Sequence, residues 1–303
     1  MPRVSVKIFD RKLDYACLVR VPGFPYLMPE HLEDNWLTPV PGMTSRQWVP
    51  SYYEIEGPIL DVRVASRSLL ARVTFDLIKE RNSEATGVYP TQRDVYERLR
   101  RLKFPAISHL ARYTETAINR LEGKFAVFGD SISSQRRLNW QKFSESSWAI
   151  CLHGIPTDFQ NLYITVTIAR LLLYRISNNL RSSSLQTLIV LDEASTVFKK
   201  HFETREGTFL LLDYLAQARE FGVGFLIGTQ SLTNLADSVL SNTAVKIMIG
   251  GCGAGHDYAT FAAAAGMTIE QREFMKRDKT PGHAFVSDPR WPVAFQVEVP
   301  RVA

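Results

Sequence analysis

Two adjacent carboxylates follow an apolar segment near the middle of the chain. The segment QTLIVL leads directly into Asp192 and Glu193. Ionised carboxylates beside an apolar strand are costly unless a cation or hydrogen-bond donors engage them. Adjacent strand residues point to opposite faces, so the two side chains can do different work. In phosphoryl transfer, one such carboxylate holds Mg²⁺ and the other orients or deprotonates a water molecule. The simpler interpretation is a solvated acidic strand end.

Polar side chains also flank the next apolar segment, FGVGFLI. Gln230 follows this segment, and a Gln there can hydrogen-bond both a γ-phosphate and a water molecule. Arg219 precedes it, at the end of a predicted helix, and Arg stabilises charge that develops on a transferring phosphate. Each residue also has a plain structural interpretation. Gln230 can be a polar strand cap, and Arg219 a cation favourably placed at a helix C-terminus.

The elements that would position these residues alternate between strand and helix. Strands are expected near residues 148–152, 187–192, 223–229 and 245–250, with helices over 159–178, 208–220 and 235–240. This alternation predicts an α/β fold with one mainly parallel sheet flanked by helices. Ligands bind at the carboxyl ends of such strands, so Asp192 and Gln230 are expected at the same edge. Segments 284–287 and 293–299 predict a C-terminal β-hairpin.

The first half of the chain is less regular. Residues 4–9 predict a strand. Residues 20–58 are rich in Pro and Gly without a helical period, so they are expected to be irregular. Helical spacing returns over residues 62–122, where Thr91 is a candidate helix cap. We interpret residues 62–122 as a helical insertion.

The composition is that of a globular protein, with 303 residues, 45% hydrophobic residues and a net charge of +5. This excess permits an anionic partner without requiring one. The three cysteines, Cys17, Cys151 and Cys252, form no CxxC motif and are expected to be reduced thiols of a cytoplasmic protein. The longest charge-free run, residues 221–236, contains Gly, Gln, Ser, Thr and Asn, so no membrane span is expected.

The series TLIVLDEAS … LLDYLAQAREFGVGFLIGTQSLTNLADSVLSNTAVKIMIG resembles the HerA/FtsK superfamily of hexameric P-loop ATPases, which includes the ATPases of conjugation and type IV secretion. The resemblance is good over residues 147–251 and looser elsewhere. It implies one RecA-like ATPase domain over residues 1–303 that uses ATP and Mg²⁺. It also implies a homo-hexamer that translocates DNA or powers a DNA-processing or transfer complex, with a nuclease or a secretion complex as a further partner.

The resemblance implies roles for four residues. Asp192 would be the Walker B carboxylate that serves Mg²⁺ and the nucleotide, and Glu193 would be the catalytic carboxylate. Gln230 would be the sensor residue that contacts the nucleotide. Arg219 would be an arginine finger that reaches the nucleotide of a neighbouring subunit. Ser195 departs from the family, in which His is frequent here, and this departure leaves the subfamily open.

The phosphate loop of such an ATPase, GxxxxGK[ST], is missing from this sequence. The segment Leu121–Gly129 (LEGKFAVFG) contains Gly-Lys, but Phe125 replaces the hydroxyl residue, and IGGCGAGHDY lacks Lys. We therefore expect a RecA-like domain without its P-loop strand and helix, forming the later part of a longer protein and inactive alone. Its sheet should have an exposed edge beside the Walker B strand or the Gln230 strand.

Three hypotheses follow for the function. The first is an ATP-driven motor of the HerA/FtsK type, which accounts for the four polar residues together. The second is a non-catalytic, P-loop-less relative that acts as an interaction module with an active partner. The third is a doubly wound enzyme with an unrelated substrate, in which the acidic pair is incidental.

Three smaller motifs remain. Two of them have both a functional and a structural interpretation, and the third has a structural interpretation only. Asp10 and Asp14 are a metal pair or, more simply, a strand end followed by a solvated turn. The basic segment 198–205 (FKKHFETR) is a loop that contacts DNA phosphates or a solvated surface loop. The segment 98–103 (RLRRLK) is expected to be an exposed helix face.

Overall fold

The computed structural model describes residues 4–105, 107–136, 138–200, 210–249, 255–278 and 280–300. The chain forms two compact units. The first unit consists of Met1–Asp192 and Phe209–Ile227, and the second of Glu193–Thr208 and Gly228–Ala303.

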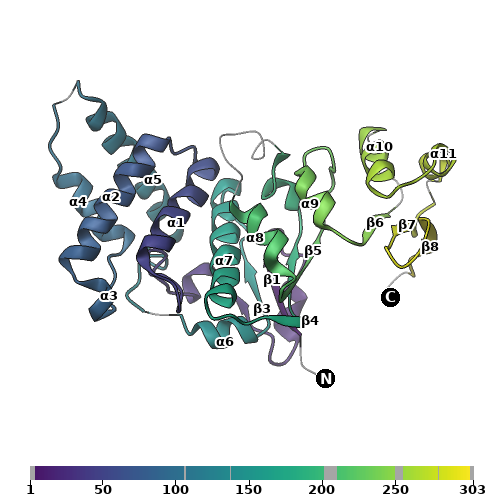
Figure 1. Cartoon of the computed structure of the whole chain (residues 1–303), viewed down its shortest axis with the longest axis horizontal. Helices are drawn as coiled ribbons and strands as arrows, with labels where there is room; N and C mark the ends of the chain where they lie inside the picture. The colour runs from purple at the N-terminus through teal and green to yellow at the C-terminus, as the bar shows by residue number, and fades with distance from the viewer. Residues whose placement is uncertain are drawn as a thin grey trace. The chain divides into compact units, whose positions relative to one another are not determined.

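A five-stranded parallel sheet organises the first unit (Figure 1). Its strands are β1 (Ser5–Asp10), β2 (Tyr26–Leu27), β3 (Trp148–Cys151), β4 (Ser182–Leu191) and β5 (Phe221–Ile227), in the order β2-β3-β1-β4-β5. All four neighbouring pairs are parallel. The predicted α/β fold with a parallel sheet is confirmed. Three of the four strands expected in that sheet, β3, β4 and β5, belong to it.

The central strands of this sheet are buried on both faces. Ile8, Ala149 and Val190 lie side by side on adjacent strands and pack against the segment that follows β1, which includes the short helix η1 (Ala16–Arg20). Phe9 points to the opposite face and is 1% exposed. Because the central strands are covered on both faces, their central residues are mainly apolar, as in parallel strands generally.

The helix α7 (Thr157–Ser177) is buried around most of its circumference, as its nearly all-round apolar pattern predicts. It contacts β5, the helix α8 (Leu210–Ala218) and the short helix α6 (Trp140–Glu145). It therefore joins the sheet to the helices that surround it.

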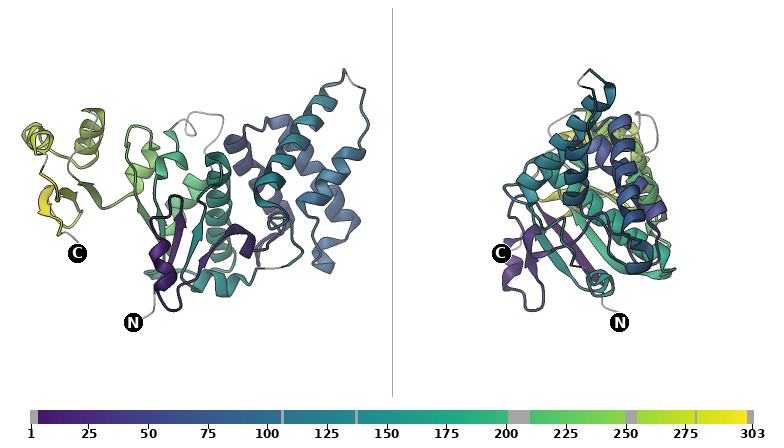
Figure 2. Two further views of the ribbon diagram at one scale, coloured as in Figure 1. Left: turned by 180° about the vertical axis from the view of Figure 1, so that it is seen from behind. Right: turned by 90° about the vertical axis from the view of Figure 1, so that its left-hand side faces the viewer.

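A body of helices lies between β2 and β3 in the sequence (Figures 1 and 2). Its members are α1 (Ser45–Leu60), α2 (Val64–Glu80), α3 (Ser83–Thr86), α4 (Gln92–Arg101) and α5 (His109–Phe128). The helix α1 contacts both α2 and α7, and α2 contacts α4 and α5. Thr91 caps α4, because its side chain accepts from the Asp94 N–H, as predicted.

The chain enters and leaves this helical body through two paired segments, which we call the stem (residues 34–36 and 131–133). The Asp34 N–H donates to the Ser131 carbonyl at 2.7 Å, and the Trp36 N–H donates to the Ile132 carbonyl at 3.3 Å. Asn35 forms an antiparallel bridge with Ser133. The two ends of the helical body therefore lie side by side.

The expectation that residues 20–58 are irregular is wrong in its second half, because α1 begins at Ser45. This helix contains Pro50 and Pro58, which concealed it in the sequence. Its buried side includes Trp48 and Ile55, both fully buried, and this burial offsets the backbone hydrogen bonds that the prolines remove.

The second unit contains a separate antiparallel sheet of β6 (Lys246–Ile249), β7 (His283–Ser287) and β8 (Phe295–Glu298). The predicted C-terminal hairpin is β7–β8. One face of this sheet packs against α10 (Gly255–Ala264) and α11 (Ile269–Arg277), mainly through Met248, Phe285, Tyr258 and Met275.

The prediction that the strand near 245–250 joins the parallel sheet is wrong. This segment contains β6, which pairs antiparallel with β7. Its consecutive apolar residues specify a strand but not the strand's partner.

Candidate functional site

Asp192 directly follows β4, at the carboxyl edge of the parallel sheet, and is half-buried. The neighbouring strand β1 ends at Asp10, and its following turn brings Tyr15 close to Asp192. Burial raises the pKa of the Tyr15 hydroxyl, and the charges of Asp192, Asp10 and Asp14 raise it further. The first unit thus gathers negative charge at the carboxyl ends of β1 and β4, as expected of a cation-binding edge.

Asp10 is fully buried and organises the turn after β1. Its carboxylate accepts the Lys12, Asp14 and Tyr15 N–H groups at 3.1–3.2 Å and the Tyr26 hydroxyl at 2.7 Å. These donors occupy the Asp10 carboxylate, and residues 12–14 are exposed, so β1 ends in a solvated turn, as the simpler interpretation predicted. Asp10 supports the sheet edge beside Asp192, while Asp14 is exposed.

Glu193 has a backbone conformation that is unusual for a residue with a side chain. Its φ is +54°, in the left-handed region, and it caps the short helix η3 (Ala194–Thr196). The Glu193 carbonyl accepts the Thr196 N–H at 3.0 Å and the Thr196 hydroxyl at 2.9 Å. Residues held in this region cluster at functional sites, where the surrounding structure must compensate the strain. The chain therefore turns sharply between the two adjacent carboxylates.

The second unit brings the segment after Glu193 next to the segment that carries Gln230. The Ala194 N–H donates to the Gly228 carbonyl at 2.9 Å, and the Ala236 N–H donates to the Phe198 carbonyl at 2.9 Å. Gln230 itself is exposed. The loops that carry Glu193 and Gln230 are therefore joined by backbone hydrogen bonds, although they lie far apart in the sequence.

Hydrogen bonds made by the Thr229 hydroxyl and the Asp257 carboxylate hold the Gln230 loop. The Thr229 hydroxyl donates to the Ser231 carbonyl at 3.0 Å. The buried Asp257 carboxylate accepts the Leu232 and Thr233 N–H groups at 2.9 and 3.0 Å. Sequence reasoning missed Asp257, which no local motif distinguishes from a solvated acid at the start of a helix.

Arg219 lies at the amino ends of the parallel strands, whereas Asp192 lies at their carboxyl ends. It precedes β5, whereas Asp192 follows β4, and Leu191 pairs with Ile227 at the far end of β5. A strand of this length spans roughly 20 Å. Arg219 is exposed, and none of the ion pairs between described residues includes it. Within one chain, therefore, Arg219 is not brought to the carboxylate edge.

The basic segment 198–205 is only partly described. Phe198 is fully buried, and the Lys200 ammonium pairs with the Asp237 carboxylate at 2.9 Å, at the start of the helix α9 (Asp237–Asn242). Residues 201–205 lie outside the described residues, so their interpretation as a DNA-contacting loop stays a prediction.

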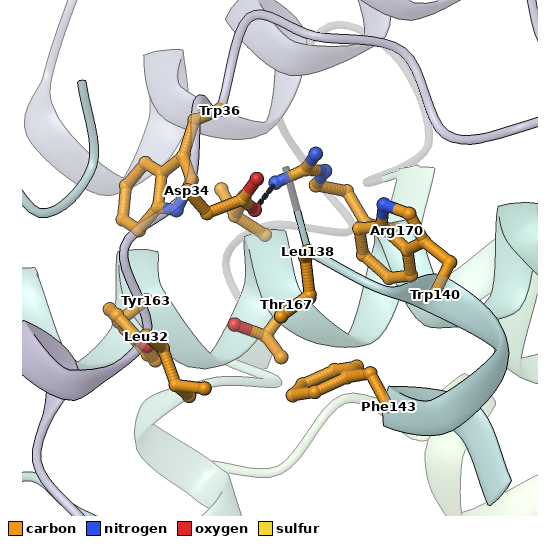
Figure 3. A pocket seen from close by; sticks show the side chains of 10 residues that line it. Leu32, Asp34, Trp36, Leu138, Trp140, Phe143, Tyr163, Thr167 and Arg170 are labelled. Carbon is orange, nitrogen blue, oxygen red and sulfur yellow. Dashed lines mark hydrogen bonds and ion pairs between the residues drawn. The ribbon is translucent and has the colours of Figure 1, made fainter. Parts of the chain in front are cut away.

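A buried ion pair that the sequence did not reveal lies between the stem and α7 (Figure 3). The Arg170 guanidinium donates to the Asp34 carboxylate and to the Thr38 carbonyl, and it lies over the Trp140 ring at 4.8 Å. A cavity of about 20 Å³ beside Arg170 and Trp140 has room for one water molecule. This pair joins the helical body to the sheet and is not part of the carboxylate edge.

A metal ion at Asp192 would need ligands from elsewhere. Among the described residues there is no group of three or more His, Cys, Asp or Glu side chains that could hold a metal ion. A single carboxylate such as Asp192 suits Mg²⁺, because this ion keeps several waters and takes one or two carboxylates together with substrate phosphates. It does not suit a metal that requires a complete protein cage.

No family model matches the sequence, and no curated protein matches it. Solved structures do share its fold. VirB4 of Thermoanaerobacter pseudethanolicus has a TM-score of 0.72 at 12% identity, over 99% of this chain and 82% of that chain. The bacterial conjugative coupling protein TrwBΔN70 has a TM-score of 0.67 at 10% identity, over 98% of this chain and 78% of that chain. TrwB in complex with the GTP analogue GDPNP has a TM-score of 0.59 at 9% identity, over 98% of this chain and 85% of that chain.

At these identities the likeness establishes the fold. The chain has the α/β fold of VirB4 and TrwB, with a parallel sheet flanked by helices, as the sequence predicted. Across the described ranges, no helix is long and apolar enough to cross a membrane.

Proposed function

We propose that this chain is part of an ATP-hydrolysing motor of the HerA/FtsK type that moves DNA or powers a DNA-transfer complex. The observation that carries the proposal is the carboxylate at the carboxyl edge of a parallel sheet, in a chain with the fold of VirB4 and TrwB. TrwB binds a nucleotide analogue, which supports a nucleotide site in a chain of this fold. The motor is proposed to be a cytoplasmic homo-hexamer that works with a nuclease or a secretion complex.

Each polar residue has a proposed role. Asp192 holds Mg²⁺ through its water shell, and Glu193 accepts a proton from the attacking water. Gln230 contacts the γ-phosphate and that water. These assignments follow the division of labour between the two carboxylates in phosphoryl transfer. The half-buried position of Asp192 and the backbone hydrogen bond that joins the Glu193 and Gln230 loops support them.

The nucleotide requires donors that this sequence does not supply. The triphosphate of ATP is held by backbone amides and a Lys in a GxxxxGK[ST] loop, and the 303 residues contain no such motif. We propose that a strand bearing this loop comes from a segment outside these residues and pairs with β5. Within the described residues β5 pairs only with β4, so its other edge is available for a further strand.

Features of the second unit agree with a missing strand. In the described part of the chain, β6 pairs only with β7. Val245, Ile247 and Ile249 are 44%, 59% and 60% exposed, which is high for branched apolar residues in and beside a strand. An apolar strand with one unpaired edge is prone to aggregation unless another segment covers that edge. Such a segment would bury these three side chains.

Calorimetry with Mg-ATP tests the missing phosphate loop. For the isolated 303-residue chain and Mg-ATP, we expect a dissociation constant above about 10 μM, a value that corresponds to roughly 7 kcal/mol of binding free energy. Tighter binding would show that these residues contain a phosphate site of their own.

Hydrolysis tests the motor itself. A tagged chain is purified from its native source, together with any segment or subunit that supplies the phosphate loop. We expect this assembly to hydrolyse ATP, and Glu193→Gln to abolish hydrolysis while ATP binding is retained, because the substitution removes only the base. Glu115→Gln, which removes an exposed carboxylate from α5, is the matched control. Hydrolysis by Glu193→Gln within about threefold of wild type refutes the assigned role.

The alternative, a non-catalytic interaction module, makes a different prediction for the same material. An assembly that contains this chain but shows no ATP hydrolysis, or hydrolysis that Glu193→Gln leaves unchanged because a partner supplies the active site, would favour the module over the motor.

A further inference from the structure

The connection between α4 and α5 concentrates positive charge. Residues 98–113 contain five Arg or Lys residues and no Asp or Glu, which equals the net charge of +5 of the whole chain. The last turn of α4 carries Arg98, Arg100 and Arg101, and the first turn of α5 has no acidic residue. We call the surface formed by Arg101, Lys103, Phe104, Ile107, His109, Leu110, Arg112 and Tyr113 the α4–α5 tip.

Some cations of this stretch are engaged by the helical body, and others are not. The Arg98 guanidinium forms two hydrogen bonds with the Glu80 carboxylate. The Arg100 guanidinium contacts the Tyr96 hydroxyl at 3.0 Å and lies 4.0 Å from the Glu122 carboxylate. Arg101, Lys103 and Arg112 are exposed, and none of the ion pairs among described residues includes them. Three cations of the tip are therefore available to an anionic ligand.

Apolar and aromatic side chains alternate with these cations. Ile107 is 91% exposed and Leu110 is 42% exposed. The His109 ring stacks on the Tyr113 ring at a centroid distance of 6.3 Å and an interplanar angle of 24°. In both views of Figure 2 this connection projects beyond the helices of the body, so the tip is convex. Ile107 and Leu110 therefore present apolar surface to the solvent among the cations of the tip.

We propose that the α4–α5 tip binds single-stranded nucleic acid without sequence preference. Arg101, Lys103 and Arg112 contact phosphates, and the rings and aliphatic side chains between them contact unstacked bases. Basic residues interleaved with aromatic ones are the chemistry by which proteins hold single strands. The proposal rests on the proposed function and deepens its DNA-directed part.

Two other anionic partners fit the tip less well. A protein partner needs a contiguous contact of about 800 Å² per side, more than a convex loop presents. A bilayer requires substantial buried apolar area in addition to charge, and the tip offers one fully exposed and one partly exposed aliphatic side chain. A flexible single strand can wrap a convex surface and needs only phosphates within reach of the cations.

Fluorescence anisotropy with a labelled 20-nucleotide oligo(dT) tests the proposal, without ATP, on the 303-residue chain. Arg101→Gln/Lys103→Gln is compared with Arg20→Gln/Lys142→Gln, which removes one exposed Arg and one exposed Lys elsewhere in the same unit. We expect the tip variant to weaken binding by about tenfold or more at low salt. It should also reduce the slope of log K against log salt by roughly 0.7 for each phosphate that the variant no longer neutralises. The control should keep both the affinity and the slope of wild type.

Ile107→Ser separates base contact from charge. This side chain is almost fully exposed, so the substitution should not alter folding, which the thermal transition checks. We expect binding to weaken by about threefold with an unchanged salt slope, because the substitution removes an apolar surface and no charge. Because the assay contains no ATP, its failure leaves the ATPase proposal untouched.

Three results would overturn the inference. In the first, both double variants lose affinity equally, which would mean that binding is diffuse. In the second, the tip variants bind oligo(dT) as wild type does. In the third, polyglutamate or phosphatidylserine vesicles bind the tip more tightly than oligo(dT) does, which would assign the surface to a protein or a membrane.

Discussion

At the scale of single residues, the backbone of Glu193 explains how adjacent carboxylates can take different roles. In a regular strand, Asp192 and Glu193 would simply point to opposite faces. The left-handed conformation at Glu193 ends the strand at once and starts η3. Such a conformation costs a non-glycine residue roughly 1 kcal/mol. A Gly would adopt it with less strain, so the presence of Glu supports a requirement for its side chain.

Lys7 is a second residue whose environment has a measurable consequence. Lys7 belongs to β1 and its side chain is fully buried, where its ammonium donates to the Phe143 and Ser146 carbonyls and lies over the Trp148 ring. Burial, followed by the charge of the nearby Arg175, lowers the pKa of Lys7 to about 7. In the unfolded chain its pKa returns to the ordinary value of 10.5.

This difference predicts how stability changes with pH. Between about pH 7 and pH 10.5 the unfolded chain binds more protons at this site, so the free energy of unfolding should rise with pH. Below pH 7, Lys7 is protonated in both the folded and the unfolded chain, so the full free-energy cost of burying its charge remains. The slope from Lys7 is at most about 1.4 kcal/mol per pH unit. Urea unfolding between pH 7 and 9 should show that Lys7→Met flattens this rise, whereas Lys142→Met, at an exposed position, does not.

An equal pH slope in wild type and Lys7→Met would contradict the prediction. Loss of the two hydrogen bonds to carbonyls can lower the stability of Lys7→Met at every pH, but it does not change the slope. The slope therefore reports the titration of Lys7 alone.

At the scale of elements, the sequence predicted strands better than their partners. Residues 188–191 of β4 and most residues of β5 are apolar, and polar residues follow both strands. Such a local pattern is typical of a parallel strand. The segment of β6 has the same pattern, yet it pairs with β7, because pairing depends on which other strands are present. Propensity also failed for α1, where burial of Trp48 and Tyr52 outweighs the two internal prolines.

The candidate site was predictable to a similar extent. Asp192 and the Gln230 segment follow strands β4 and β5, and this much could be read from alternation of strands and helices. The left-handed backbone at Glu193 and the support from Asp10 and Asp257 could not, because each depends on residues distant in the sequence. The position of Arg219 at the opposite edge follows from the parallel direction of β5.

The single pairing of β5 predicts its hydrogen exchange. Among the described strands, β1 is paired on both sides and β5 on one. Exchange measured by mass spectrometry on the isolated chain should therefore be slower for peptides covering β1 than for those covering β5, since unpaired amides open at low cost. Addition of the segment that carries the phosphate loop should slow exchange in β5 and leave β1 unchanged. Equal protection of the two strands in the isolated chain would contradict a free edge at β5.

At the scale of the whole molecule, the position of Arg219 predicts how subunits cooperate. Since Arg219 and Asp192 lie at opposite edges of one sheet, a finger role requires that Arg219 serve a neighbouring subunit. In the motor assembly, mixing Arg219→Ala subunits with Glu193→Gln subunits should restore hydrolysis. At equal amounts and random mixing, about a quarter of the interfaces in a closed ring regain both intact residues.

The control for this experiment is each variant alone, which should be inactive. Assembly of the mixed rings is confirmed by their size. No recovery at any ratio, with assembly intact, would exclude Arg219 as a residue that acts across the subunit boundary.

The stem has a consequence for the order in which the chain folds. Lys7 on β1 pairs with Trp148 on β3, so the central strands meet only after a very long loop closes. Contacts within the helical body are far more local, and local contacts form faster. Once the Asp34 and Trp36 N–H groups bond to the Ser131 and Ile132 carbonyls, the two ends of the helical body are held together. The effective chain length between β2 and β3 is then much shorter than their separation in the sequence. Prior folding of the helical body therefore lowers the entropic cost of closing the loop that brings the central strands of the sheet together.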